Sequence, residues 1–355
     1  MALVYNVNNT ATQVLAAKQV KENIFVNLLH HNGKGVTQHE ETNVSTLRML
    51  KVLPTNDNAR ELTPTNNFNG ANATNPTDNK GWFNTEGASY SNVMEYDLNL
   101  LYVYDRCVDL PEVQQDMCPA NLFDNTTKNI GGRVATEINA STIAHQLSAV
   151  FNAAVTAKAW TNLAVVLGET PNCYEAIQEA STMLDDGDTA NYIQSFPFDE
   201  REIIMRPQFR SKLMGGSGVL IGGSNYAQSM IAKGVVSPDA SKDFGNMYVG
   251  EIDMIPCHVA PKAIWDRASQ WVGTTTTAFD SVQAIVCAAS ATDRGISTQD
   301  YIKTIDSPDG AGKRLQPKTR WGINVCYPKG IVPIVNNGTA APTTQLTVTA
   351  PGSRA

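Results

Sequence analysis

The longest regular pattern of apolar positions runs from Asp124 to about Val166. Its apolar residues recur every three or four positions, at Ile130, Val134, Ile138, Leu147, Phe151, Ala154 and Val155. This spacing predicts an amphipathic helix that begins at the capping cluster 124–127 and reaches about Trp160. Gly131-Gly132 weakens its first turns, and the part beyond them would be roughly 45 Å long at 1.5 Å per residue. We expect a spine laid across a sheet; an ordinary core helix with shorter ends is the alternative.

Residues 54–92 have a different character, since they are rich in Asn, Thr and Gly and poor in aliphatic side chains. Such a stretch cannot form a core of its own. The segments on either side of it, 47–53 and 93–104, alternate apolar and polar residues as strands do. We therefore expect an extended hairpin whose long tip is ordered by a neighbouring molecule. Its aromatic residues Phe68, Trp82 and Phe83 are the predicted assembly interface, and a disordered linker is the alternative.

The remaining patterns predict a mixture of helices and strands, which places the chain in the α+β class. Helices are expected at 14–29, 173–184 and 225–233, and another opens at Pro207. Strands are expected at 202–205, 284–288, 321–327 and 330–335, with a hairpin at 247–260 and a tail at 336–355.

Composition narrows the class of protein. The chain has 355 residues and a net charge of -7, with no long run of one charge, which argues against a nucleic-acid binder that acts through its overall charge. No apolar run reaches membrane-spanning length, and the first residues lack the features of a secretory signal. The six cysteines show no CxxC spacing, so we expect reduced thiols.

No motif predicts chemistry. The glycine-rich stretch at 215–223 fits neither a dinucleotide fingerprint nor a nucleophile elbow, and Gly312-Lys313 lacks the other residues of a nucleotide-binding P-loop. The five histidines have no paired metal spacing, and Asp185, Asp186 and Asp188 read as a solvated turn, not a calcium loop. We therefore predict no catalytic residue, no cofactor and no metal.

The order of these parts resembles the tailed-bacteriophage major capsid protein of the HK97 fold. The resemblance implies a fold with an N-arm, an E-loop hairpin, a P-domain with the long spine helix, and an A-domain with a mixed sheet. The implied boundaries are N-arm 1–45, E-loop 46–100, P-domain 101–168, A-domain 169–295, P-domain return with its P-loop 296–325, A-domain closing strand 326–335, and C-terminal tail 336–355.

This resemblance implies a structural protein, not an enzyme, that assembles with itself as hexamers and pentamers into an icosahedral shell. The shell would enclose DNA without sequence-specific binding, be assembled in the host bacterial cytoplasm and form part of the virion, with no membrane. The short N-terminal region implies a separate scaffolding protein; a portal and possibly a decoration protein are further partners. Although Lys80 lies in the E-loop, no spacing identifies a covalent cross-link, and none is predicted.

Two alternatives remain open. Encapsulin shell proteins share this fold, and the stretch 14–29 could imitate their cargo-docking helix. A soluble cytosolic α/β enzyme with a mobile lid at 54–92 is the other, although no catalytic signature supports it.

Overall fold

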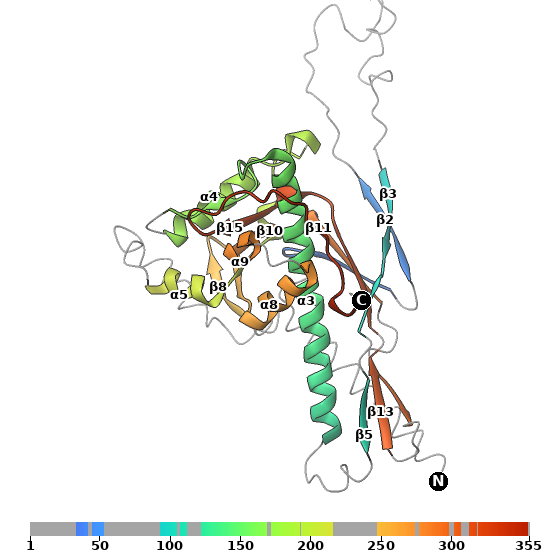
Figure 1. Cartoon of the computed structure of the whole chain (residues 1–355). Helices are drawn as coiled ribbons and strands as arrows, with labels where there is room; N and C mark the ends of the chain where they lie inside the picture. The colour runs from blue at the N-terminus through green and yellow to red at the C-terminus, as the bar shows by residue number, and fades with distance from the viewer. Residues whose placement is uncertain are drawn as a thin grey trace, which may run out of the picture.

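The structure is a computed structural model, and it describes residues 33–41, 45–52, 93–104, 107–111, 122–168, 172–191, 193–215, 247–273, 277–297, 302–306, 312–317 and 319–353. Helices and several small sheets are arranged around one long helix (Figure 1), which confirms the predicted α+β class. No helix in these ranges is long and apolar enough to cross a membrane.

The long helix is α3, Leu122–Ala157, with 36 residues. The predicted apolar stripe is buried from Ile130 to Ala154, while Val155 is half-buried. The middle of the helix, however, is buried on nearly all sides, because its polar residues Asn139, Ser141, Thr142, Gln146 and Ser148 are buried as well. The helix therefore passes through the molecule between packed elements, where the sequence predicted a helix lying across one sheet.

Two of the buried polar side chains in the middle of α3 are hydrogen-bonded to strands that surround the helix. The Ser141 hydroxyl donates to Ile138 O at 2.9 Å and accepts a hydrogen bond from Trp321 Nε1, also at 2.9 Å. Gln146 Nε2 donates to Thr292 Oγ1 at 3.1 Å. Because a buried polar group without a partner is costly, these bonds fix how the neighbouring strands sit on the helix.

Six strands form the largest sheet, in the order β6-β15-β10-β7-β9-β8. Their bounds are β6 Val165–Val166, β7 Arg201–Met205, β8 Tyr248–Ile252, β9 Ile255–Val259, β10 Val282–Ala288 and β15 Ile331–Val335. Every residue of β7, β10 and β15 is buried, so both faces of these strands are covered. The helices α4 (Cys173–Asp185) and α5 (Pro207–Gly215) pack against the sheet, and α3 packs against β15.

The hairpin predicted at 247–260 is confirmed as β8 and β9, which pair antiparallel. Its turn residues Asp253 and Met254 have φ of 52° and 66°, as a tight hairpin turn of the primed type requires. The chain continues into α8, Lys262–Val272, which packs along α3 and ends at Gly273 with φ of 79°.

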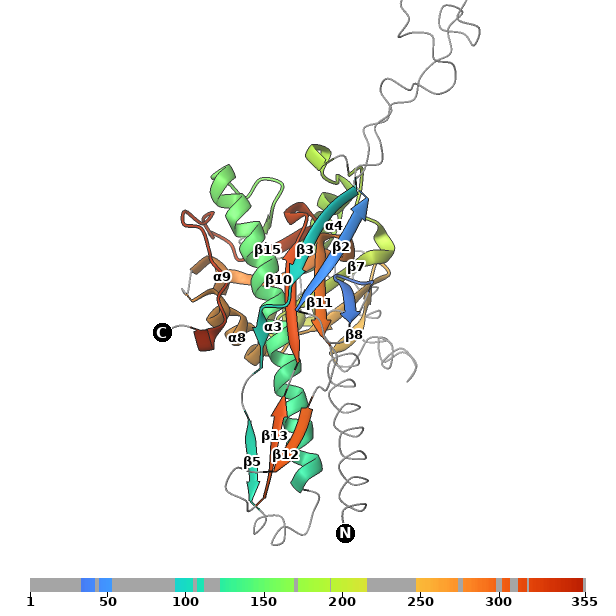
Figure 2. The same ribbon diagram turned by 90° about the vertical axis from the view of Figure 1, so that its right-hand side faces the viewer.

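A second sheet has the order β1-β11-β14-β4, with β1 Thr37–Glu41, β4 Tyr102–Val103, β11 Thr292–Ser297 and β14 Arg320–Val325. The predicted strand at 93–104 is divided at Leu100 and Leu101. Its first part, β3 (Val93–Asn99), pairs with β2 (Thr46–Val52) in a separate hairpin. Figures 1 and 2 both show this hairpin at one side of the body.

A third sheet, of three strands in the order β12-β13-β5, lies beside the beginning of α3 at the end opposite the β2–β3 hairpin (Figure 2). Its strands are β5 Val108–Pro111, β12 Ile302–Asp306 and β13 Gly312–Pro317. We call this sheet together with the first turns of α3 the foot.

Residues 336–353, where the sequence predicts a tail, pack on the body. Leu346 is buried, Trp160 Nε1 donates to Thr339 O at 3.0 Å, and Thr349 N donates to Trp271 O at 2.9 Å. The expectation of a tail is therefore corrected for these residues, because they cover apolar surface of α3 and α8.

Candidate assembly site at the base of the hairpin

The predicted interface residues Phe68, Trp82 and Phe83 lie outside the residues that the structure describes. The strands on either side of them are described, and β2 and β3 pair antiparallel from Thr46 opposite Asn99 to Val52 opposite Val93. The predicted pairing of these flanks is confirmed. Residues 53–92 therefore leave and re-enter the described chain at neighbouring points, as the tip of a hairpin does.

The base of the hairpin rests on two glycines. Leu47, Leu98 and Leu100 form a small buried cluster of their own, separate from the main core. Gly295 on β11 lies opposite Gly322 on β14, and this pair supports the leucines. A Cβ on Gly295 would lie 2.5 Å from Leu47 Cδ1, and one on Gly322 would overlap the backbone oxygen of Asn99. We call this glycine pair with the three leucines the hairpin seat.

A polar contact lies beside the seat. The Tyr96 hydroxyl on β3 donates a hydrogen bond to Asp293 Oδ2 on β11. The Cys326 thiol donates to the same oxygen at 3.1 Å, and His39 Nε2 on β1 lies 3.7 Å from Asp293 Oδ1. Side chains of the hairpin and of the second sheet thus meet at one buried carboxylate, since Asp293 is only 5% exposed.

Burial raises the pKa of Tyr96, and its hydrogen bond to the negatively charged Asp293 raises it further. The phenol therefore stays protonated and remains a hydrogen-bond donor throughout the physiological pH range. The contact is a charge-assisted hydrogen bond, which is stronger than one between neutral groups.

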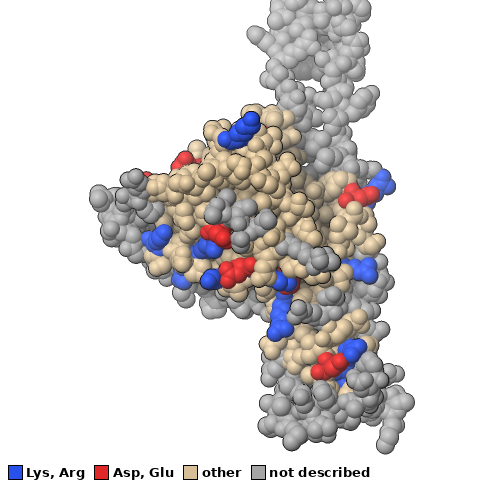
Figure 3. All heavy atoms as spheres, viewed as in Figure 1, with Lys and Arg blue, Asp and Glu red and all other residues tan. Residues whose placement is uncertain are grey.

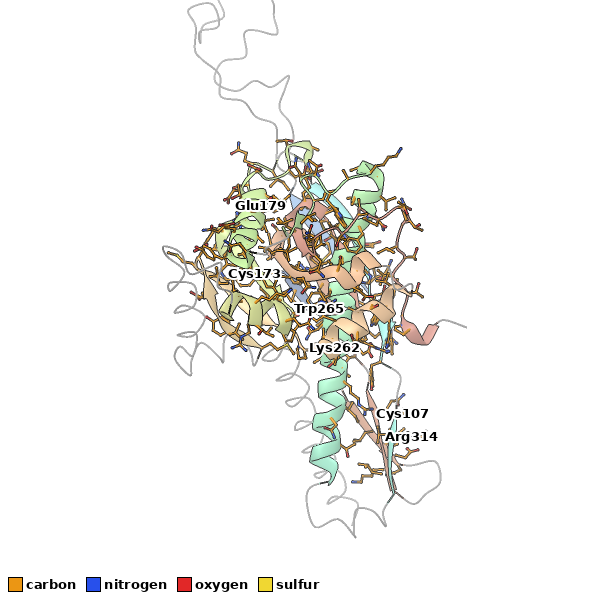
Figure 4. The ribbon with its side chains drawn as sticks, turned by 60° about the vertical axis from the view of Figure 1, so that its left-hand side comes forward. Cys107, Cys173, Glu179, Lys262, Trp265 and Arg314 are labelled. Atoms are coloured by element: carbon orange, nitrogen blue, oxygen red, sulfur yellow. The ribbon has the colours of Figure 1, made fainter. Side chains whose placement is uncertain are left out.

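The foot carries an exposed ion pair. Arg314 on β13 donates from Nε and Nη2 to the two oxygens of Asp109 on β5, at 2.5 and 2.7 Å. The hydrogen bond from Arg314 lowers the pKa of Asp109. Figure 4 shows Arg314 and Cys107 together at this end of the molecule, away from Trp265 and Glu179 in the body.

A groove of about 530 Å³ lies where α3, α8, β4 and residues 350–352 meet. Its Glu137 carboxylate accepts from Arg267 Nε at 2.6 Å and from Trp271 Nε1 at 3.0 Å. Because both oxygens are engaged, Glu137 is arranged as a structural group and not as a free acid or base.

The histidine of the spine is also structural. His145 Nδ1 donates to Ser141 O at 2.8 Å, so Nε2 is the acceptor for the Tyr102 hydroxyl at 2.9 Å. Burial lowers the pKa of His145, which favours the neutral ring. In the described ranges there is no group of three or more His, Cys, Asp or Glu side chains that could hold a metal ion.

Figure 3 shows Lys and Arg interspersed with Asp and Glu on the face in view. No large field of one sign gathers there among the coloured residues.

No protein-family model matches the chain, and no curated protein matches it in sequence. Solved structures do match. The capsid of Ralstonia phage GP4 has a TM-score of 0.52 and 10% identity, over 91% of this chain and 91% of that chain. The capsid structure of the cyanophage P-SCSP1u has a TM-score of 0.50 and 11% identity, over 88% and 90%. A structure from Microbacterium phage Oxtober96 has a TM-score of 0.50 and 13% identity, over 85% and 90%.

These matches extend over most of both chains, so they concern the architecture as a whole and not one shared motif. Identities this low show the fold alone. The chain therefore has the fold of phage capsid proteins, the fold that the order of its parts in the sequence resembles.

Proposed function

We propose that this chain is the major capsid protein of a tailed bacteriophage and assembles as hexamers and pentamers into the icosahedral shell around the genome. The observation that carries the proposal is the β2–β3 hairpin, whose base packs on the body at the seat and through Tyr96. An isolated two-stranded hairpin is marginal in water. Its outer part thus needs a partner, which a neighbouring copy would supply.

The finer parts of the HK97 architecture belong to this proposal. The E-loop is 46–100, with β2 and β3 as its base. The P-domain contains α3 and the foot, and the A-domain contains every strand of the six-stranded sheet except β6. The N-arm is 1–45 and the P-loop lies between β12 and β13. We propose Phe68, Trp82 and Phe83 as the residues of the E-loop tip that a neighbouring copy buries.

The proposed role is structural and non-enzymatic. The chain would work in the virion after assembly in the host bacterial cytoplasm, with a separate scaffolding protein, a portal and a possible decoration protein as partners. The satisfied carboxylate of Glu137 and the neutral ring of His145 support a structural reading of the polar groups beside α3.

The test uses the double variant Trp82→Ser, Phe83→Ser beside Tyr90→Ser, a matched loss of an aromatic in the same stretch. Each buried aromatic is worth on the order of 1.5–3 kcal/mol. We expect the double variant to keep the circular dichroism of the wild-type subunit and to lose most of its shells in electron micrographs. The Tyr90 variant should assemble.

Unfolding of the double variant would place both residues in the core of their own subunit. Shells at wild-type yield would make the stretch a passive linker. Wild-type particles that contain protein cargo and no nuclease-protected DNA would favour the encapsulin-like alternative, and a monomer that never assembles would remove the shell role.

A further inference from the structure

The hairpin meets the second sheet through two kinds of contact. The first is the hairpin seat, where three leucines lie on Gly295 and Gly322. Apolar contact of this kind has no preferred direction, and two glycines present no side chain that would oppose a rotation. The seat therefore holds the base of the hairpin in place and leaves its angle weakly defined.

The second contact is directional. Tyr96 lies two residues before Leu98 on β3, and Asp293 lies two residues before Gly295 on β11. Alternate residues of a strand point to the same face and are about 7 Å apart. The Tyr96 ring packs against the leucine cluster, while its hydroxyl reaches Asp293, two residues along β11 from Gly295. The hydrogen bond therefore acts away from the glycine pair, where it resists rotation of the hairpin.

We propose that Tyr96 and Asp293 form a latch that sets the angle of the hairpin, with the Gly295–Gly322 pair as its pivot. The accessibility of the Cys326 thiol shows whether this latch is closed or open. Cys326 Sγ is half-buried and lies 3.1 Å from Asp293 Oδ2 and 3.7 Å from the Tyr96 oxygen. Opening of the latch uncovers this thiol.

The role of the latch rests on the proposed function in a shell. A chain that occupies both hexamers and pentamers must reach neighbours at different angles. A releasable hydrogen bond over a glycine pivot would allow this adjustment without change in the body. Tyr96 and Asp293 are therefore positioning residues for assembly.

The free subunit supplies its own reporters for the test. Cys326 is half-buried under the latch, Cys107 is exposed at the foot, and Cys257 and Cys287 are fully buried in the six-stranded sheet. Native subunit is treated with N-ethylmaleimide, and the labelling rate of each cysteine is followed by peptide mass spectrometry. The labelling rate of the exposed Cys107 shows that the reagent is equally active in every sample. The labelling rates of the two buried thiols show whether the whole subunit unfolds.

Tyr96→Phe removes the hydroxyl and keeps the ring and the charge of the site. We expect the labelling rate of Cys326 to rise about tenfold or more, as the loss of a hydrogen bond to a charged group predicts. Labelling of Cys107, Cys257 and Cys287 should not change. Asp293→Asn keeps one oxygen acceptor for Tyr96, so the increase at Cys326 should be smaller.

An unchanged rate at Cys326 in Tyr96→Phe would overturn the latch, because the seat alone would then hold the hairpin. Faster labelling of the two buried thiols would also overturn it, since the variant would have loosened the whole subunit. The shell yield is a separate measurement. A latch that opens while shells form normally removes its role in assembly, whereas a wild-type chain that forms no shell contradicts the proposed function and leaves the labelling result intact.

Discussion

The side chain of Asn152 is hydrogen-bonded at both ends of its amide to the backbone of Leu346. Asn152 Nδ2 donates to Leu346 O at 3.0 Å, and Leu346 N donates to Asn152 Oδ1 at 2.7 Å. The amide thus forms with Leu346 the two backbone hydrogen bonds that a neighbouring strand would otherwise form. It holds residues 336–353 against α3 at the point where Leu346 is buried.

Asn152→Ala should lower the free energy of unfolding by about 1–3 kcal/mol, because the variant leaves both backbone groups of Leu346 without their partner. Urea denaturation of the subunit measures the change. Thr156→Ala, one turn further along α3 at an exposed position, is the control and should stay within about 0.5 kcal/mol. Equal effects of the two changes would mean that the Asn152 amide does not hold the segment.

Gly322→Ala should displace the hairpin, since a Cβ at this position would overlap the backbone oxygen of Asn99. Gly295→Ala should be milder, because its nearest neighbour is a leucine methyl group that can move. We expect faster proteolysis between β2 and β3 in Gly322→Ala, with the body still folded by circular dichroism.

The control for these two changes is Gly132→Ala on α3, where a Cβ would meet nothing within 4 Å. Alanine favours a helix over glycine by roughly 0.5–1 kcal/mol, so this variant should be neutral or more stable. If Gly322→Ala were as stable and as resistant to protease as Gly132→Ala, the hairpin seat as described here would be wrong.

Acid should destabilise the subunit through Asp188. Burial by itself would raise the pKa of Asp188, but hydrogen bonds from Lys329 Nζ, at 2.9 Å, and from Asn191 outweigh it and lower the pKa. The folded state therefore holds this proton less tightly than the unfolded state. The stabilisation is complete above the unfolded value of about 3.9 and is lost as the pH falls through the lower folded value.

Lys329→Gln removes the charged partner of Asp188 and should cost about 1 kcal/mol at neutral pH, since the Lys329 ammonium is partly in solvent. Its stability should depend less on pH below 4 than that of the wild type. Lys262→Gln, an exposed lysine on α8, is the matched loss of charge. Parallel acid curves for wild type and Lys329→Gln would exclude this pair as the cause.

The thiol count checks the predicted redox state. None of the five described cysteines is in a disulfide: Cys107, Cys173, Cys257, Cys287 and Cys326. Burial raises the pKa of Cys257 and Cys287, which makes both thiols poor nucleophiles. We expect six free thiols on titration in denaturant without reductant. Of the five described thiols, Cys107 should react fastest in the native subunit, because it is exposed. A lower total would reveal a disulfide.

Local pattern was enough to predict α3, the paired flanks of the hairpin, the β8–β9 hairpin and the central strands. It would also have predicted α8, which was not identified, because Ile264, Trp265, Ala268, Trp271 and Val272 have helical spacing and are buried. The predicted interface at Phe68, Trp82 and Phe83 stays a prediction.

Other features depend on contacts between distant parts of the chain. Ser141 and Gln146 look like the solvated side of a helix, yet they are buried because Trp321 and Thr292 come from strands far along the chain. Asp188 was expected in a solvated turn. This expectation is wrong, because Asp188 is buried and its carboxylate accepts a hydrogen bond from Lys329, which lies far along the chain. The domain boundary expected at 295 falls inside β11. Nothing local to Gly295 or Gly322 predicts that they lie opposite each other.

The length of α3 has a mechanical consequence. Its 36 residues span about 54 Å at 1.5 Å per residue, from the foot into the body, where the helix packs against β15 and α8. A continuous helix buried along its middle is a stiff lever, so the foot and the body tilt together through the same angle. In a curved shell, a small displacement where one copy's foot meets its neighbours would therefore be carried across the subunit as a change of slope. The hairpin seat would then be the place where the subunit adjusts to that change.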